Sequence, residues 1–371
     1  MKLLVNLFLA VLIFLAVLPF NYFFENNFNA LPIQILIIFF LTLLFFKIKL
    51  NKLLLIFASI AVLLLTSNIE FSLLFSSAVT ASFIIIWLIL ISGNLNFTFK
   101  KFNHIITILV LIIFIFTIYF NLEFYLESGF NIRSKGFGSG TIFSILSLYS
   151  ITFIYLLYKN NSLSKFIFYT LFGVFLSTAI LTQSRGVLLS ILVVFITIEF
   201  RDLKNIKWLR LIFIFIIGFV FVFNSSVLNR FNVDQYDDLN QLTSGRSDTQ
   251  ILIIESILMS NDKMTLFFGN GLNSIKELQI KGFEYPHLDL LYLLYEGGLI
   301  LVFIYIIIMY KIYKIYFNKL IFWIYIISTF HTNMILSPGM LFLGFLFDKA
   351  IVIKSVKKRK LQDENNSSIS N

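Results

Sequence analysis

Apolar segments long enough to cross a membrane recur along almost the whole chain. They lie near residues 3–20, 31–46, 53–66, 71–92, 104–120, 141–158, 166–182, 187–199, 208–223, 289–310, 320–335 and 339–353. A bilayer core needs about 20 apolar residues per helix, and somewhat fewer in a tight bundle. Only 13% of the residues are charged, whereas soluble domains carry about 25%. The sequence therefore predicts an all-α polytopic membrane protein with about 12 transmembrane helices.

Basic residues concentrate in alternate connections between these segments. With the N-terminus in the cytoplasm, 21 of the 29 Lys and Arg residues fall on the inner side, and 14 of the 19 Asp and Glu residues fall on the outer side. This bias predicts that both termini are cytoplasmic. The net charge of +10 is then explained by attraction to anionic headgroups. Membrane lipid is an expected partner and nucleic acid is not.

The lengths of the connections divide the chain into five parts. These are N-terminal helices (1–120), central helices with Arg-bearing periplasmic loops (121–223), one large periplasmic loop (224–288), C-terminal helices (289–353) and a basic, disordered cytoplasmic tail (354–371). Structureless loops beyond about 15 residues are uncommon unless they are functional. In the large loop, Ser247-Asp248-Thr249-Gln250 reads as a capping box that opens a helix reaching about Met259. Gly269-Asn270-Gly271 then marks a turn.

Three arginines on the predicted outer face are candidates for a binding site, on a face that carries mostly acidic residues. They are Arg133, Arg185 and Arg246. Considered alone, Arg185 fits two interpretations equally well: a functional residue with an anionic partner, or a snorkelling residue that only marks a turn. Considered alone, Arg133 and Arg246 are typical solvated loop residues. Together they favour a site for a phosphorylated lipid headgroup, because a guanidinium fork matches a phosphate and stays charged.

A histidine opens the tenth apolar segment. His287 has Glu284 and Asp289 nearby to orient its ring, which would suit a proton acceptor tuned near neutral pH. The alternative is an interfacial histidine beside Pro286, which simply starts the helix. The chain has no cysteine, no Asp-x-Asp or His-x-x-x-His pattern and no phosphate-binding glycine motif. No metal site and no cofactor are therefore expected, and the substrate should arrive already activated.

Several short motifs in a fixed order resemble the O-antigen polymerase and O-antigen ligase superfamily of bacterial envelope glycosyltransferases. The resemblance covers roughly residues 130–300. It is carried by Thr182-Gln183-Ser184-Arg185-Gly186, Gly245-Arg246, Gly269-Asn270-Gly271 and Pro286-His287-Leu288-Asp289, a run that ends in Glu296-Gly297.

The resemblance implies a reaction and roles for the candidate residues. Donors in the family are glycans on undecaprenyl diphosphate, presented at the periplasmic leaflet, and transfer is metal-independent with inversion at the anomeric carbon. Arg185 and Arg246 would bind the diphosphate, and Arg133 would bind either the diphosphate or the acceptor. His287, oriented by Asp289, would be the catalytic base.

The sequence leaves three functions open: polymerase, ligase and flippase. The family's Asn-Pro-Asn element is missing, since Gly138-Ser139-Gly140-Thr141 stands there instead, and the chain is short and rich in Phe and Ile. Both features favour a polymerase, with lipid-linked oligosaccharide as donor and acceptor; a chain-length regulator is a further partner that this reading allows. A ligase would use lipid A-core as acceptor. A flippase or secondary transporter usually shows repeated halves and mid-membrane charges, and neither is evident here.

Overall fold

The described part of the chain is a bundle of helices. The computed structural model describes residues 2–17, 31–46, 78–92, 102–128, 140–182, 185–200, 246–258, 263–272, 274–275, 288–329, 334, 337 and 339–353. Its helices are α1 (Lys2–Val17), α2 (Leu31–Phe45), α5 (Ala78–Ser92), α6 (Phe102–Ser128), α7 (Gly140–Lys159), α8 (Lys165–Leu181), α9 (Arg185–Phe200), α13 (Arg246–Leu258), α14 (Lys263–Phe268), α16 (Asp289–Ile315), α17 (Lys319–Thr329) and a C-terminal helix over residues 339–353.

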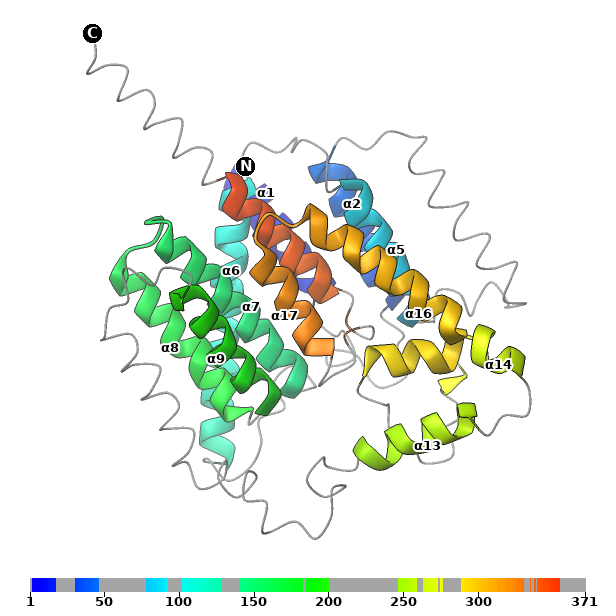
Figure 1. Cartoon of the computed structure of the whole chain (residues 1–371). Coiled ribbons are helices and arrows are strands. Elements are labelled where there is room, and N and C mark those ends of the chain that lie inside the picture. The colour runs from blue at the N-terminus through cyan, green and yellow to red at the C-terminus, as the bar shows by residue number, and fades with distance from the viewer. Residues whose placement is uncertain are drawn as a thin grey trace.

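The helices run between two ends of the bundle (Figure 1). The N-terminus, the α7–α8 turn and the last residues of the C-terminal helix lie at one end, and α13, α14 and the start of α16 lie at the other. The closest helix pairs include α7 with α8, α1 with α6 and α14 with α16. The sequence predicts that these two ends face opposite sides of the membrane.

The predicted apolar segments that fall among the described residues coincide, wholly or in part, with helices. Within the described residues, three stretches are long and apolar enough to cross a membrane: Phe102–Glu123, Ile142–Lys159 and Asp289–Ile315. Shorter apolar helices include Leu3–Val17, Ile33–Phe45, Ser82–Ser92, Lys165–Leu181 and Lys319–Thr329. The predicted segments 53–66 and 208–223 lie outside the described residues. A helical membrane protein is thus supported, and the number of crossings stays a prediction.

A polar turn joins α7 to α8. Asn161 adopts a positive φ of 53°, its N–H donates to the Tyr158 carbonyl at 2.9 Å, and the Ser162 N–H donates to the Leu157 carbonyl at 2.9 Å. These two bonds form the motif that commonly ends a helix at a left-handed residue. Ser164 then caps α8 by accepting from the Ile167 N–H. Because both helix ends are satisfied within a few residues, α7 and α8 form a tight antiparallel hairpin.

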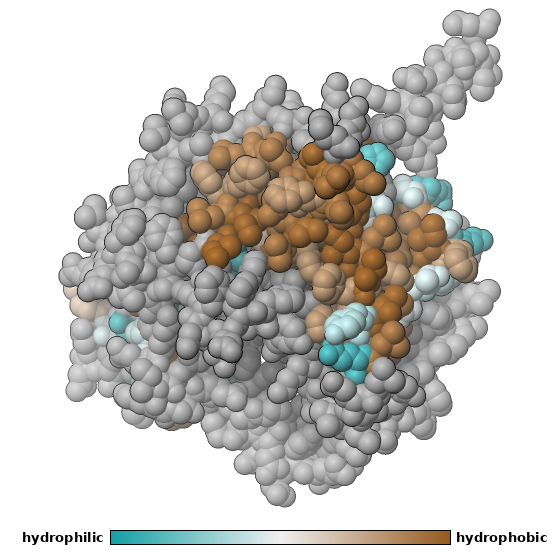
Figure 2. Space-filling model, turned by 180° about the vertical axis from the view of Figure 1, so that it is seen from behind, coloured by the Kyte–Doolittle hydropathy of each residue, from teal (hydrophilic) through white to brown (hydrophobic). Residues whose placement is uncertain are grey.

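The outward faces of several helices are apolar. Seen from behind, a broad apolar face covers α1, α2 and α6 (Figure 2). Its exposed side chains include Leu3, Leu4, Phe8, Leu36, Phe40, Leu111 and Ile115. A water-soluble monomer rarely exposes a contiguous apolar patch larger than a few hundred Å², and a helix that is apolar all round belongs in a core or a membrane. This surface is suited to lipid.

A buried aspartate holds the turn between α16 and α17. Asp348, on the C-terminal helix, accepts hydrogen bonds from the Phe317 N–H at 3.0 Å and the Asn318 N–H at 2.6 Å. Lys319 donates to the carbonyls of Tyr313 and Tyr316, where α16 ends. These contacts tie three C-terminal helices together at the end of the bundle opposite to α13.

Candidate functional site

Three candidate residues each stand first in a helix. Arg185 begins α9, Arg246 begins α13 and Asp289 begins α16. All three helices begin at the same end of the bundle (Figure 1). Backbone N–H groups at a helix start carry partial positive charge and favour anions. This end of the bundle therefore combines two arginine positions with helix starts, which is typical of a site for an anion.

Two candidate residues lie outside the described residues. These are Arg133, in the loop before α7, and His287, two positions before α16. The predicted loop helix is present, and its last residue, Leu258, is one short of the predicted Met259. It begins at Arg246, so Ser247 lies inside the helix and is not its cap. The predicted turn at Gly269-Asn270-Gly271 is also present, with φ of 74° at Gly269 and 95° at Gly271.

The structure brings together two motif segments that are well separated in sequence. The Asn270 N–H donates to the Tyr295 carbonyl at 2.8 Å, and the Gly271 N–H donates to the Glu296 carbonyl at 3.0 Å. The Asn270 side-chain amide also donates to the Tyr295 carbonyl, at 3.2 Å. We call this contact between residues 267–271 and residues 295–298 the loop clamp. It attaches the large loop to the middle of α16.

Glycine is required on both sides of the loop clamp. Gly298 has φ 64° and ψ −169°, so α16 is bent there and is not the straight helix that the apolar run 289–310 predicts. A Cβ on Gly298 would lie 2.3 Å from the carbonyl carbon and oxygen of Phe267. A Cβ on Gly269 would lie 2.4 Å from the same atoms of Glu296. The two backbones approach so closely that no side chain fits between them.

Replacing Gly298 with alanine is expected to open the loop clamp. The backbone conformation costs an L-residue about 1–3 kcal/mol, and the overlap with Phe267 adds about 1–3 kcal/mol. The free energy of unfolding should fall accordingly, measured by thermal unfolding in detergent. Gly173→Ala in α8 is the matched control, because its Cβ meets nothing within 4 Å and alanine favours a helix by up to about 1 kcal/mol. Equal stability of the two variants would contradict the proposed steric role.

Two carboxylates lie on one face of the first half of α16. Asp289 is 0% exposed and Glu296 is 1% exposed. Residues seven apart in a helix differ by only about 20° around its axis, so both lie on the same face, about 10 Å apart along it. Ionisable groups buried in a membrane bundle are costly and usually functional. The sequence analysis assigned Glu296 no role. Its spacing of seven residues from Asp289 within an apolar segment already indicates that the two acids share a helix face.

A buried tyrosine pair lies beyond this face. The hydroxyls of Tyr305 and Tyr325 are 3.4 Å apart, and both side chains are buried. Both phenols are within electrostatic range of Asp289. The tyrosine pair forms a polar contact between α16 and α17 inside the bundle.

A second polar cluster joins α6 to α8 and was not predicted. The Asn121 amide donates to the Ser177 hydroxyl at 3.1 Å and to the Thr178 hydroxyl at 2.9 Å. Thr182 at the C-cap of α8 is fully buried, and its hydroxyl donates to the Ala179 carbonyl at 3.0 Å. Hydrogen bonds between apolar helices stabilise their packing in lipid. This cluster supports the end of α8 directly before Arg185.

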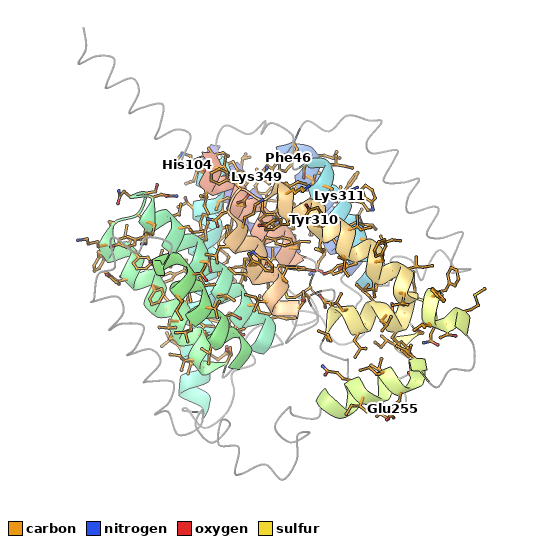
Figure 3. All side chains as sticks on the ribbon, in the orientation of Figure 1. Phe46, His104, Glu255, Tyr310, Lys311 and Lys349 are labelled. Carbon is orange, nitrogen blue, oxygen red and sulfur yellow. The ribbon has the colours of Figure 1, made fainter. Side chains whose placement is uncertain are left out.

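Four ionisable residues labelled in Figure 3 lie at the two ends of the bundle. Lys311, Lys349 and His104 lie at the end that carries the chain termini, and Glu255 lies at the opposite end, on α13.

The candidate site is the end of the bundle where α9, α13 and α16 begin and where the loop clamp attaches α13 and α14 to α16. Asp289 and Glu296 are buried there, Glu255 on α13 is exposed, and the two described arginine positions open helices. Such a site is suited to binding an anion next to a buried carboxylate. Comparison of the chain with known protein families, with curated proteins and with solved structures found no match.

Proposed function

We propose that this protein polymerises lipid-linked oligosaccharide repeats of the O-antigen or capsule type. The donor is a glycan on undecaprenyl diphosphate, and the acceptor is a second lipid-linked repeat. In this proposal the chain crosses a bacterial inner membrane about 12 times, with both termini cytoplasmic and the site facing the periplasm. The protein belongs, in this reading, with the O-antigen polymerases and ligases that its motifs resemble.

The loop clamp is the observation that carries the proposal. It joins Gly269-Asn270-Gly271 to Glu296-Gly297, two of the segments on which the resemblance rests. Motifs that matched the family only by chance would not be expected to lie in contact. The contact between these two segments therefore supports the resemblance. The same contact brings the loop helix headed by Arg246 to the helix headed by Asp289.

Diphosphate departure is the step that the arginines would assist. The acceptor hydroxyl oxygen forms a bond to the anomeric carbon while the bond from that carbon to the phosphate oxygen breaks and the diphosphate leaves with its electrons. Negative charge grows on the departing oxygens, and preorganised cations aimed at them lower the barrier. Arg185 and Arg246 have this role in the proposal, and Arg133 binds the diphosphate or the acceptor.

Proton removal from the acceptor is assigned to His287. Its ring takes the hydroxyl proton as the new bond forms, and Asp289 orients the ring and stabilises its charged form. Asp289 is suited to this because it is fully buried two residues further on, at the start of α16. A carboxylate held in a helix at a buried position has little freedom to turn away from its partner.

Reconstitution of the full-length protein tests the reaction class. Purified protein in liposomes is given lipid-linked repeats, with and without lipid A-core, in the presence of a chelator. A polymerase forms a ladder of longer lipid-linked glycans without lipid A-core. Transfer that occurs only with lipid A-core would instead show a ligase, and movement of repeats across the bilayer with no new glycosidic bond would show a flippase.

Reporter fusions test the orientation independently of the reaction. Fusions within residues 224–288 should report a periplasmic location, and fusions at the C-terminus should report a cytoplasmic one. A cytoplasmic location of the large loop would refute the proposal, because the loop would then be separated from donors presented at the outer leaflet.

A further inference from the structure

The short helix α14 exposes an apolar face. Met264, Phe267 and Phe268 are 62%, 49% and 60% exposed. Their spacing of three and four residues places them on one side of the helix. On the other side, Leu266 packs with Ile253 and Ile257 of α13 and Leu291 of α16. The helix therefore buries one apolar face against the protein and turns a second apolar face outward.

The loop clamp fixes where this face lies. The backbone at Phe267 and Phe268 is in contact with Gly298, and the turn that follows is hydrogen-bonded to the carbonyls of Tyr295 and Glu296. Gly298 is the residue at which α16 bends. The apolar face of α14 therefore lies beside the bend in α16 (Figure 1).

The bend also marks where α16 starts to cross the bundle. Residues 298–315 rise about 27 Å at 1.5 Å per residue, close to the hydrocarbon thickness of about 30 Å. Directly after the bend, Leu299, Ile300 and Phe303 are apolar and exposed. In a membrane-crossing helix these side chains face lipid. The apolar face of α14 therefore adjoins the lipid-facing surface of α16.

We infer that Met264, Phe267 and Phe268 insert into the leaflet beside the bend in α16, so that α14 anchors the large loop to the membrane surface. The occupant of this face is the acyl region of the lipid, because the face continues the lipid-facing surface of α16 and consists of apolar side chains alone. The inference concerns where the loop lies and holds whatever reaction the protein catalyses.

Membrane depth at single labelled positions tests the inference. The natural sequence has no cysteine, so Met264→Cys and Phe268→Cys each provide a unique site for a nitroxide label. Each labelled protein is placed in lipid nanodiscs that hold one copy. Collisions of the label with oxygen, which partitions into lipid, are compared with collisions with a water-soluble nickel complex. Phe303→Cys on α16 is the lipid-facing control, and Glu255→Cys on α13, exposed and polar, is the water-facing control.

Labels at positions 264 and 268 are expected to resemble the label at position 303, with oxygen collisions exceeding nickel collisions several-fold. The label at position 255 should show the reverse. Nickel collisions at 264 and 268 as frequent as at 255 would overturn the inference, as would protection from both reagents. Lipid-like behaviour only in discs that hold two copies would show a self-association surface instead and would equally overturn it. An unchanged thermal unfolding temperature of each labelled variant verifies that it is folded. Positions 264 and 268 provide two independent measurements of the membrane depth of α14.

Discussion

Arg185→Ala is expected to abolish long-chain glycan while the protein remains inserted in the membrane. In the proposed reaction Arg185 stabilises the diphosphate as it departs. Removing one such preorganised group typically costs about 2.7–4 kcal/mol, or about 10²–10³ in rate. A loss of this size at every addition step stops the growth of the chain at single repeats.

The measurement is the glycan ladder in cells and the initial rate with lipid-linked repeats in liposomes. Lys165→Ala is the matched control, because it removes one positive charge from the other end of α8, where the side chain is exposed. That variant should form normal ladders. Unchanged ladders with Arg185→Ala, at equal protein level in the membrane, would remove Arg185 from the diphosphate site.

Arg246→Lys is expected to be severely impaired although it keeps the charge. A guanidinium presents a rigid fork of donors that matches phosphate oxygens in pairs, whereas an ammonium is a point charge. Loss of one charge-assisted hydrogen bond costs about 1.5–3 kcal/mol, and each 1.4 kcal/mol is about tenfold. The rate of transfer should therefore fall about 10- to 100-fold.

Steady-state kinetics in the same liposomes measure this effect. Glu255→Gln on the same helix is the control, because it changes the charge of α13 at an exposed position. Its rate should equal that of the parent protein. Full activity of Arg246→Lys would indicate that only the positive charge matters and would contradict bidentate hydrogen bonding of the guanidinium to the diphosphate.

Helix positions were largely predictable because apolar runs and polar breaks alternate along the chain. The α7–α8 hairpin is an example: the apolar runs 141–158 and 166–182 predict its helices within about one residue of Gly140–Lys159 and Lys165–Leu181. Between them, Asn161 and Ser164 are residue types that end and begin helices. Local chemistry decides such boundaries, so the sequence alone reveals them.

The bend in α16 and the loop clamp were not predictable in the same way. Gly297 and Gly298 sit inside an apolar run, where glycines are tolerated in a membrane helix and no local signal requires a bend. The need for glycine arises from the backbone of Phe267, about thirty residues earlier in the chain. A steric requirement that comes from residues so distant in the sequence produces no hydrophobic periodicity and no motif in the residues around Gly298.

The candidate site was predictable in part. Arg246 stands out as an arginine on a predicted outer face that carries mostly acidic residues, and Asp289 stands out as a carboxylate near His287. The structure places both at helix starts at one end of the bundle. The second acid, Glu296, received no role, although its spacing from Asp289 indicates a shared helix face, and the structure shows that both acids are buried on α16. The polar cluster around Asn121 depends on α6 meeting α8, a pairing that hydropathy does not reveal.

The loop clamp also has a consequence for biogenesis. Its two halves leave the ribosome at different times, because residues 267–271 emerge before residues 295–298 and synthesis proceeds from the N-terminus. A nascent chain that contains the large loop but has not yet released Gly298 has α13 and α14 without the loop clamp. Insertion of α16 thus completes the end of the bundle where α13 and α14 lie, and a truncation upstream of Gly298 should make the large loop more sensitive to proteases on whichever side of the membrane it lies.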